Sequence, residues 1–317
     1  MTIIAGVDEA GFGPKLGPLV MSGAAFRVPD DRADECMWRM LRGTCVKKPT
    51  RKGRRLAVAD SKVLYRDSLA PLERAALVML AVRDFRPQTW YGLLAGIAPL
   101  AIEPLKSCAW YSADVGLPVD GEVGDVATKA NAVRSDCQDQ GVEFVGVFSE
   151  PLAEFSYNEI VARTRNKAAV NMGLALRVID RILRSAPDID VRIYVDRLGG
   201  RVHYREALGA SFPEYDLQIL HESVDQSAYR LLSPDRICTV EFSVGGEDRH
   251  FATALASVYS KYVRELYMRA FNSYWSAQLD GLRPTAGYYG DADRWLKDAA
   301  PLLQRLAIRK SMLVRQR

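Results

Sequence analysis

The amino-acid sequence predicts an α/β protein built around a mixed sheet. Short runs of β-branched and apolar residues alternate with segments of helical spacing through most of the 317 residues. The chain opens with two predicted strands, 2–8 and 19–27, joined by a loop, and this favours an antiparallel pair within the sheet. Hydrophobic residues make up 48% of the chain, which is enough to bury a large core.

The individual elements follow from the spacing of apolar residues. Strands are expected where β-branched and apolar residues form short runs, at 2–8, 19–27, 90–97, 142–148, 191–195, 215–220 and 237–244. Helices are expected where apolar residues recur every three or four positions, at 33–42, 66–84, 151–184 and 250–275. Two short helices should follow the chain breaks near Pro284 and Gly290. The segment 44–57 is predicted to be an exposed loop, and we assign no role to 98–141.

Composition excludes several classes of protein. No apolar run approaches the ~20 residues that span a bilayer, so no membrane segment is expected. The first residues lack the basic start and apolar middle of a signal peptide, which favours a cytoplasmic protein. The five cysteines are odd in number and form no CxxC, so neither a disulfide framework nor a zinc site is indicated.

Basic residues are concentrated in two segments, although the net charge of +4 is small. Six of them fall within nine positions: Lys47, Lys48, Arg51, Lys52, Arg54 and Arg55. Five more end the chain with no acid among them: Arg305, Arg309, Lys310, Arg315 and Arg317. Two interpretations stay open for both segments, a solvated mobile surface or contact with the phosphates of a polyanion.

Three carboxylates stand at the ends of predicted strands. Asp8 and Glu9 follow the first strand, and Asp196 follows the strand 191–195. Sites in α/β sheets gather at the carboxyl ends of strands, and oxygen-only ligands suit Mg²⁺ or Mn²⁺. Adjacent strand residues point to opposite faces, so we expect the backbone to turn between the first two acids. The alternative is that all three cap helices or pair with nearby basic side chains.

A glycine-rich loop, GFGPKLG at 11–17, comes directly after the first two acids. It is neither a dinucleotide-binding GxGxxG nor a P-loop. Such a loop can present backbone N–H groups to an anion or a hydroxyl, although a tight turn explains the glycines equally well.

The segment GVDEAGFGPKLGPLV at 6–20 closely resembles the opening motif of the type 2 ribonucleases H. Three further segments resemble the family's motifs and occur in the family's order, namely ADSK at 59–62, YVD at 194–196 and ASVYSKYVRE at 256–265. GYYGD at 287–291 and IRKSM at 308–312 are similar to the archaeal and eukaryotic branch. The resemblance covers roughly half the chain and fails over 98–141 and most of 205–245, which look like insertions.

The resemblance implies a ribonuclease H-like mixed five-stranded sheet flanked by helices, with a C-terminal helical part over the substrate groove. It divides the chain into a catalytic core, 1–275, and a helical substrate-groove subdomain, 276–317. Its four metal-binding acids fall on Asp8, Glu9, Asp196 and Glu265. The residues expected to contact the substrate are Gly11, Phe12, Gly13, Lys62, Lys261, Arg264 and Tyr288.

The implied reaction is two-metal hydrolysis, with Mg²⁺ or Mn²⁺, of an RNA strand paired with DNA or of a single ribonucleotide in duplex DNA. The products would carry a 5′-phosphate and a 3′-hydroxyl. Three positions depart from the family's pattern: Phe12 replaces Arg, Arg197 replaces Gly and Glu265 replaces Asp. Two alternatives therefore stay open, a nucleic-acid-binding paralogue with weakened catalysis and a nuclease of the same fold that acts on another structure, such as a DNA junction.

Overall fold

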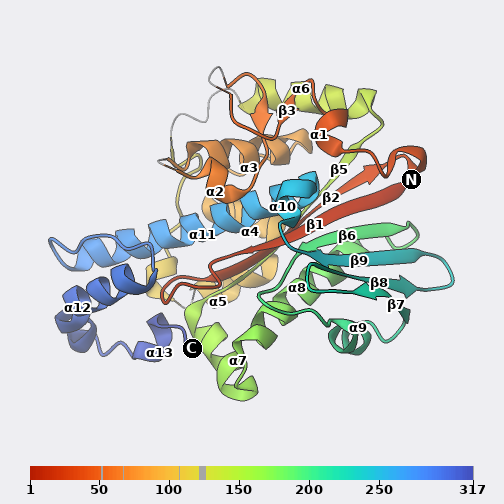
Figure 1. Ribbon diagram of the computed structural model, residues 1–317. Coiled ribbons are helices and arrows are strands. Elements are labelled where there is room, and N and C mark those ends of the chain that lie inside the picture. The colour runs from red at the N-terminus through yellow and green to blue at the C-terminus, as the bar shows by residue number, and fades with distance from the viewer. Residues whose placement is uncertain (51–52, 67, 107, 121–125, 317) are drawn as a thin grey trace.

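A seven-stranded mixed sheet forms the centre of the computed structural model, which describes residues 1–50, 53–66, 68–106, 108–120 and 126–316 (Figure 1). Its strands are β1 (Thr2–Ala10), β2 (Leu19–Val28), β5 (Glu143–Leu152), β6 (Val191–Asp196), β7 (Asp216–Glu222), β8 (Gln226–Leu232) and β9 (Ile237–Ser243). Their order in space is β5-β2-β1-β6-β9-β8-β7. β1, β6 and β9 are parallel, and every other pairing in this sheet is antiparallel. The expected five-stranded mixed sheet is therefore present as β5-β2-β1-β6-β9, and β8 and β7 extend it.

Helices cover both faces of the sheet. They are α1 (Met37–Met40), α2 (Ser61–Leu64), α3 (Ala70–Val82), α4 (Trp90–Ile97), α5 (Ile102–Lys106), α6 (Val126–Asp139), α7 (Glu154–Thr164), α8 (Lys167–Arg184), α9 (Arg205–Ser211), α10 (Gly246–Arg249), α11 (Phe251–Gln278), α12 (Tyr289–Arg305) and α13 (Lys310–Leu313). Three 3₁₀ turns lie at Asp30–Arg32, Pro99–Ala101 and Ala109–Tyr111, and a small parallel pair is formed by β3 (Cys45–Val46) and β4 (Leu56–Ala57).

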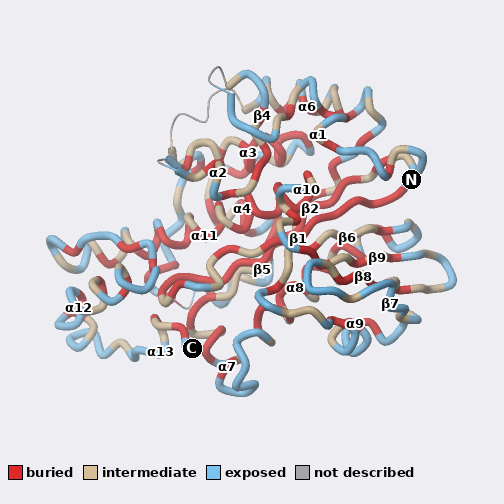
Figure 2. Tube along the Cα trace, in the orientation of Figure 1, coloured by how far each residue is buried: buried red, intermediate tan, exposed pale blue. Residues whose placement is uncertain are grey.

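The two faces of the sheet bury separate hydrophobic cores. One core lies between the sheet and α11, with α3 and α4 behind that helix, and the other lies between the sheet and α8. β1 is buried on both faces, which explains its unbroken apolar run (Figure 2). Gly6 lets α11 lie directly on this strand, because a Cβ atom at that position would stand 2.0 Å from the backbone nitrogen of Thr253.

The parallel strands bring their carboxyl ends to one edge of the sheet. β1 and β6 pair as far as Val7 and Val195, so Asp8 and Glu9 lie just beyond the last pair. Asp196 pairs with Ser243 at the end of β9. This edge therefore holds the sequence-predicted carboxylates of both strands.

The segment 90–97 is a helix, α4, so the prediction of a strand there is wrong. Trp90, Leu93, Leu94 and Ile97 are all buried, and their spacing places them on one side of a helix. The helix begins at Thr89, whose hydroxyl accepts a hydrogen bond from the Gly92 N–H group. The short apolar run is compatible with a strand and with a helix, and the Thr89 cap at its start indicates the helix.

Other boundaries differ from the predictions more modestly. The helical segment 151–184 is two helices, α7 and α8, divided at Arg165, which has a left-handed φ of 51°. Within 33–42 only Met37–Met40 is α-helical, and α12, at 17 residues, is longer than expected. The stretch 98–141 contains two helices in its described part, while residues 107 and 121–125 lie outside the described residues.

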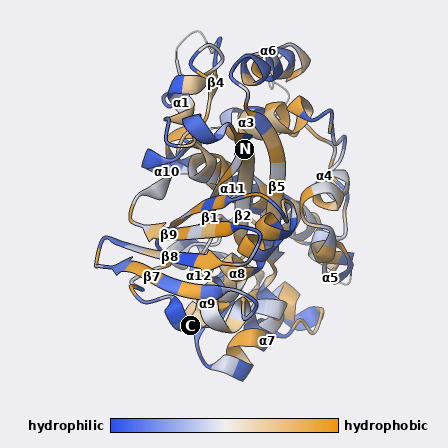
Figure 3. Ribbon diagram, turned by 90° about the vertical axis from the view of Figure 1, so that its right-hand side faces the viewer, coloured by the Kyte–Doolittle hydropathy of each residue, from blue (hydrophilic) through white to orange (hydrophobic). Residues whose placement is uncertain are grey.

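The region 205–245 contains β7 and β8, which extend the five-stranded sheet, and β9, which belongs to that sheet. β8 is absent from the predicted strands, and β9 lies beside β6 within the mixed sheet. Figure 3 shows β7 at the free edge of the sheet with both hydrophobic and hydrophilic residues along it. Within the described ranges, no helix is long and apolar enough to cross a bilayer.

Candidate active site

Asp8 and Glu9 lie at the end of the central strand and point to its two faces. β1 continues through both residues to Ala10, so the expected turn between them is absent and comes after Ala10 instead. Asp8 lies on the α11 side, where Ser260 Oγ donates to its backbone carbonyl at 2.8 Å. Both carboxylates are nevertheless close enough to Asp196, the last residue of β6, for its charge to raise their pKa values.

Burial and mutual repulsion dominate the electrostatics of these acids. Burial raises the pKa of Asp8 well above its ordinary value, and the charges of Glu9 and Asp196 raise it further. Burial also raises the pKa of Glu9 to about 7, with Asp196 as the next cause, while Asn171 and Lys62 oppose the shift. The charge of Asp196 therefore acts on both Asp8 and Glu9.

Glu247 is a fourth carboxylate of this region, and sequence reasoning missed it. It lies in α10, the short helix that follows β9, and burial raises its pKa to about 7 with Asp196 as the next cause. The Gly246 N–H group beside it donates to Asp196 Oδ1 at 3.1 Å. The sequence feature that could have indicated Glu247 is its position just after β9, one of the parallel strands. The region before it matches no motif of the type 2 ribonucleases H.

Glu265, the predicted fourth acid, has other partners. Lys261 Nζ lies 2.6 Å from its Oε1, Arg264 Nη1 lies 3.3 Å from the same oxygen, and the Tyr65 hydroxyl donates to Oε2 at 3.1 Å. Its charge is thus compensated locally by Lys261 and Arg264. The charges that raise the pKa values of Asp8, Glu9 and Glu247 are those of Glu9, Asp196, Glu247 and Asp60, and Glu265 is not among these causes. The structure therefore brings together three of the four predicted acids and adds Glu247.

The four grouped carboxylates suit a hard cation. In the described part of the chain, no three acidic, histidine or cysteine side chains are placed so that they could hold a metal ion without rearrangement. Asp196 nevertheless raises the pKa of the other three, and Glu9 Oε2 and Glu247 Oε2 are buried without a hydrogen-bond partner. Buried, unpaired carboxylate oxygens are costly, and oxygen ligands are those that Mg²⁺ and Mn²⁺ prefer. The residues present thus fit such an ion.

The predicted substrate-contacting residues surround the glycine-rich loop, 11–17. Gly11 has a φ of 85°, and an added Cβ atom there would stand 2.6 Å from Arg264 Nε. The Arg264 guanidinium is buried and lies 5.3 Å from the centre of the Tyr288 ring, which is 47% exposed. Phe12 is half-buried against the α8-side core, with Lys167 Nζ 5.8 Å from its ring centre.

The two predicted lysines differ in their surroundings. The Lys62 side chain is 84% exposed, and its charge lowers the pKa of Glu9. Lys261 is mostly buried, because it pairs with Glu265 and lies 4.6 Å from the centre of the Tyr65 ring. Lys62 is therefore accessible to a substrate beside the carboxylates, whereas Lys261 is engaged within the protein.

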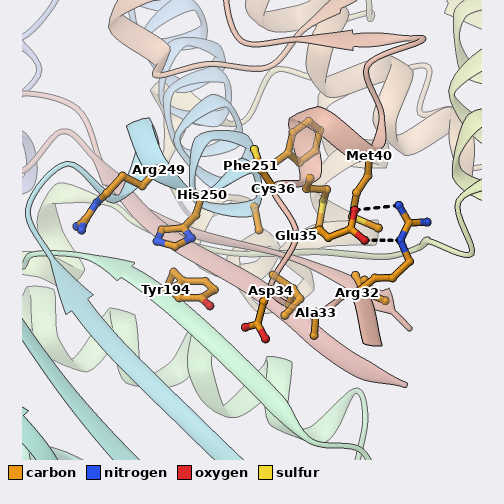
Figure 4. A pocket seen from close by; sticks show the side chains of 14 residues that line it. Arg32, Ala33, Asp34, Glu35, Cys36, Met40, Tyr194, Arg249, His250 and Phe251 are labelled. Carbon is orange, nitrogen blue, oxygen red and sulfur yellow. Dashed lines mark hydrogen bonds and ion pairs between the residues drawn. The ribbon is translucent and has the colours of Figure 1, made fainter. Parts of the chain in front are cut away.

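A pocket of about 220 Å³ lies near the start of α11, away from these acids (Figure 4). The Tyr194 and His250 rings stack there with centres 3.7 Å apart. Arg32 and Glu35, which also line the pocket, form an ion pair. Burial lowers the pKa of His250 to about 4. None of the four grouped carboxylates lines this pocket, so it is distinct from the site at the strand ends.

Comparisons with known proteins find similarity among solved structures. No family model matches the chain. Nor does any curated protein. Ribonuclease HII of Archaeoglobus fulgidus, solved in a complex with PCNA, is 15% identical, with a TM-score of 0.42, over 99% of this chain and 94% of that chain. The ribonuclease H2 of Pyrococcus horikoshii OT3 is 14% identical, with a TM-score of 0.45, over 98% and 92%.

A third solved structure, of Bst-RNase HIII in complex with Mn²⁺, is 14% identical with a TM-score of 0.44. It aligns over 99% of this chain and 66% of its own. The chain is thus similar along nearly its whole length to ribonucleases of the type 2 and type 3 kinds. At these identities the similarity does not assign a role to any single residue.

Proposed function

We propose that this chain is a divalent-metal-dependent endonuclease that cuts the RNA strand of RNA–DNA hybrids, or single ribonucleotides in duplex DNA. The products would carry a 5′-phosphate and a 3′-hydroxyl. The observation that carries this proposal is the group of four carboxylates, Asp8, Glu9, Asp196 and Glu247, beside a glycine-rich loop at the carboxyl ends of the parallel strands.

These four carboxylates are the residues that would hold Mg²⁺ or Mn²⁺. Such ions supply Lewis acidity to a phosphoryl group and lower the pKa of an attacking water. The need for an ion also follows from charge, because a cluster of carboxylates repels a phosphate backbone unless a cation is present. We assign the fourth position to Glu247 rather than Glu265, since Glu265 is already neutralised by its own neighbours.

The surrounding residues would position the substrate strand. The Phe12 and Gly13 N–H groups face no partner among the described residues and could meet the ribose 2′-hydroxyl. Tyr288 offers an exposed ring for stacking on a sugar or base, a contact worth ~1–3 kcal/mol. Lys62 would place a positive charge near a phosphate, since its ammonium group is exposed beside the carboxylates.

A cleavage panel tests the proposal. The substrates are an RNA–DNA hybrid, a duplex with one ribonucleotide, all-DNA and all-RNA, each with Mg²⁺, with Mn²⁺ and with chelator. We expect cleavage of the first two only, and only with a divalent ion. Cleavage of all-DNA at a comparable rate, or unchanged cleavage in chelator, would overturn it.

Replacing Asp8 with Asn ties the activity to this site. The substitution keeps the shape of the side chain and removes a charge that should hold the metal. We expect cleavage to fall by orders of magnitude, while hybrid binding without metal holds or improves because repulsion of the phosphates is reduced. The matched control is Asp188→Asn, an exposed acid in the turn before β6 at the opposite edge of the sheet. A wild-type rate for purified Asp8→Asn would exclude this site.

A further inference from the structure

The glycine-rich loop is held by parts of the chain that are remote in sequence. Gly17 donates its N–H group to Glu154 Oε1 at 2.8 Å, and this buried carboxylate also accepts from the Tyr111 hydroxyl. Lys15 and Leu16 donate their N–H groups to the Gly287 carbonyl at 2.8 and 3.2 Å. The second half of the loop is therefore tied to α7 and to the segment before α12.

Arg315 forms hydrogen bonds with the first half of the loop. Its Nη2 donates to the Gly11 carbonyl at 2.5 Å and to the Pro14 carbonyl, and its own N–H group donates to the Lys15 carbonyl at 2.9 Å. The residue is 5% exposed, and its guanidinium lies 5.2 Å from the centre of the Tyr157 ring. One side chain from the segment after α13 thus spans the loop that follows the two adjacent acids.

The bond to Gly11 fixes the direction of a neighbouring N–H group. In a planar trans peptide, the N–H group of a residue points opposite to the carbonyl of the residue before it. Because Arg315 draws the Gly11 carbonyl inward, the Phe12 N–H group must point away from Arg315. That N–H group has no hydrogen-bond partner among the described residues. Gly11 itself, with its φ of 85°, needs a glycine for this conformation.

The segment that carries Arg315 is itself anchored. Asn158 in α7 donates through Nδ2 to the carbonyls of Ser311 and Val314, both at 2.7 Å. Its Oδ1 accepts from the Gln316 N–H group at 2.7 Å. Hydrogen bonds on both sides of Arg315 limit its backbone, so the guanidinium is presented to the loop from a fixed position.

We propose that Arg315 is a specificity-determining positioning residue, which sets the Phe12 N–H group in the orientation that detects a ribose 2′-hydroxyl. This inference rests on the proposed function, and it adds a residue that touches the loop but not the substrate. Nε and Nη1 of Arg315 are buried without a hydrogen-bond partner, so the hydrogen bonds of this guanidinium among the described residues are those to the loop carbonyls.

The test compares Arg315→Met with Arg181→Met, both in an Asp8→Asn background that binds without cutting. Arg181 is a matched control, because its guanidinium also ties two carbonyls, those of Ser149 and Ile97, but far from the loop. The measurements are the Kd for a duplex with one ribonucleotide and the Kd for the same duplex with a deoxynucleotide there. Thermal unfolding is followed for each variant.

The ribose preference is the ratio of the two Kd values. We expect Arg315→Met to lower it by about tenfold, the value of one hydrogen bond. The whole change should come from weaker binding of the ribonucleotide duplex. Arg181→Met should lose stability without losing preference. A folded Arg315→Met with the wild-type preference would overturn the inference. If Arg315→Met does not fold, Arg315→Gln keeps a polar side chain that ends two atoms short of the Nη2 position and so cannot reach the Gly11 and Pro14 carbonyls, and an unchanged preference there overturns it equally. A parent protein without any ribose preference would instead refute the proposed function.

Discussion

The surroundings of a carboxylate separate a metal ligand from a structural acid in this chain. Glu247 and Glu265 are both only partly exposed to solvent. Glu265 lies between Lys261 and Arg264, which balance its charge. Glu247 instead faces Asp196, with one oxygen buried and unpaired. The charge of Asp196 raises the pKa of Glu247, and a bound cation relieves this repulsion.

Neutralising these two glutamates one at a time should therefore have opposite consequences. We expect Glu247→Gln to weaken Mg²⁺ affinity by about tenfold or more, since it removes a charged ligand, and to raise the melting temperature without metal. Glu265→Gln should leave Mg²⁺ affinity unchanged and cost about 1 kcal/mol of stability, because Lys261 loses its partner in a largely shielded pair. Titration of the melting temperature with Mg²⁺ measures both. Equal reductions of affinity would refute the distinction.

Phe12 shows how one departure from the family's pattern is accommodated. The ring packs on the α8-side core, which an arginine could not do as well, and Lys167 supplies a positive charge next to it. In the proposed function this loop recognises the substrate through backbone N–H groups, so their direction would matter more than the side chain at position 12. Arg315, about 300 positions away in the chain, donates to the Gly11 carbonyl, and this is the bond that we propose orients the Phe12 N–H group.

At the scale of the element, the basic segment begins at Lys47, next to the helix that carries Glu247. Lys47 Nζ lies 3.3 Å from Asp248 Oδ1 in α10, the helix that carries Glu247, and 5.5 Å from the centre of the Trp38 ring. Arg54 and Arg55 are exposed, while Arg51 and Lys52 lie outside the described residues. A segment attached at this point can reach a duplex that enters the site.

Changing Lys47, Lys48, Arg54 and Arg55 to Ser together should flatten the salt dependence of hybrid binding. Removing one basic side chain that meets a phosphate reduces the slope of log K against log salt by roughly one unit. The controls are Arg86→Ser and Arg184→Ser, exposed arginines remote from the carboxylates, which should leave the slope unchanged. A slope that stays at the wild-type value in the fourfold variant would mean that the segment is only a solvated loop.

The elements also show what a single sequence can predict. β1, β2, β5, β6, β7, β9 and α11 are predicted close to their observed bounds, because short β-branched and apolar runs specify the strands and the helical spacing of apolar residues specifies α11. The prediction fails at α4, since eight apolar residues satisfy both the helical and the strand period. It misses β8 because the burial of that strand depends on neighbours that only the folded sheet provides. Glu247 is missed for the same reason, as its proximity to Asp196 comes from pairing between β6 and β9.

For the whole molecule, the grouped carboxylates couple stability to pH and to metal. The pKa of Glu9 and of Glu247 is raised to about 7, against an ordinary value of 4.5, so the folded chain binds more protons than the unfolded chain between these limits. Stability must then fall as pH rises through about 7. His250 acts in the opposite direction, because its pKa is lowered from 6.5 to about 4, so its contribution is complete above 6.5.

The carboxylates should dominate the pH dependence between pH 6.5 and 8.5, because the buried thiols, whose pKa values are also raised, begin to contribute only toward the upper end of this range. Without metal, we expect the melting temperature to fall by a few degrees across this range, since Glu9 and Glu247 lose their protons while still buried beside Asp8 and Asp196. Saturating Mg²⁺ should abolish the fall and stabilise the protein more at pH 8.5 than at pH 6.5, because the ion binds the ionised carboxylates and competes with protons. The Glu9→Gln, Glu247→Gln double variant should show little pH dependence and little response to Mg²⁺. A flat profile in the metal-free parent, or an equal gain from Mg²⁺ at both pH values, would mean that these four acids do not act as one cation site.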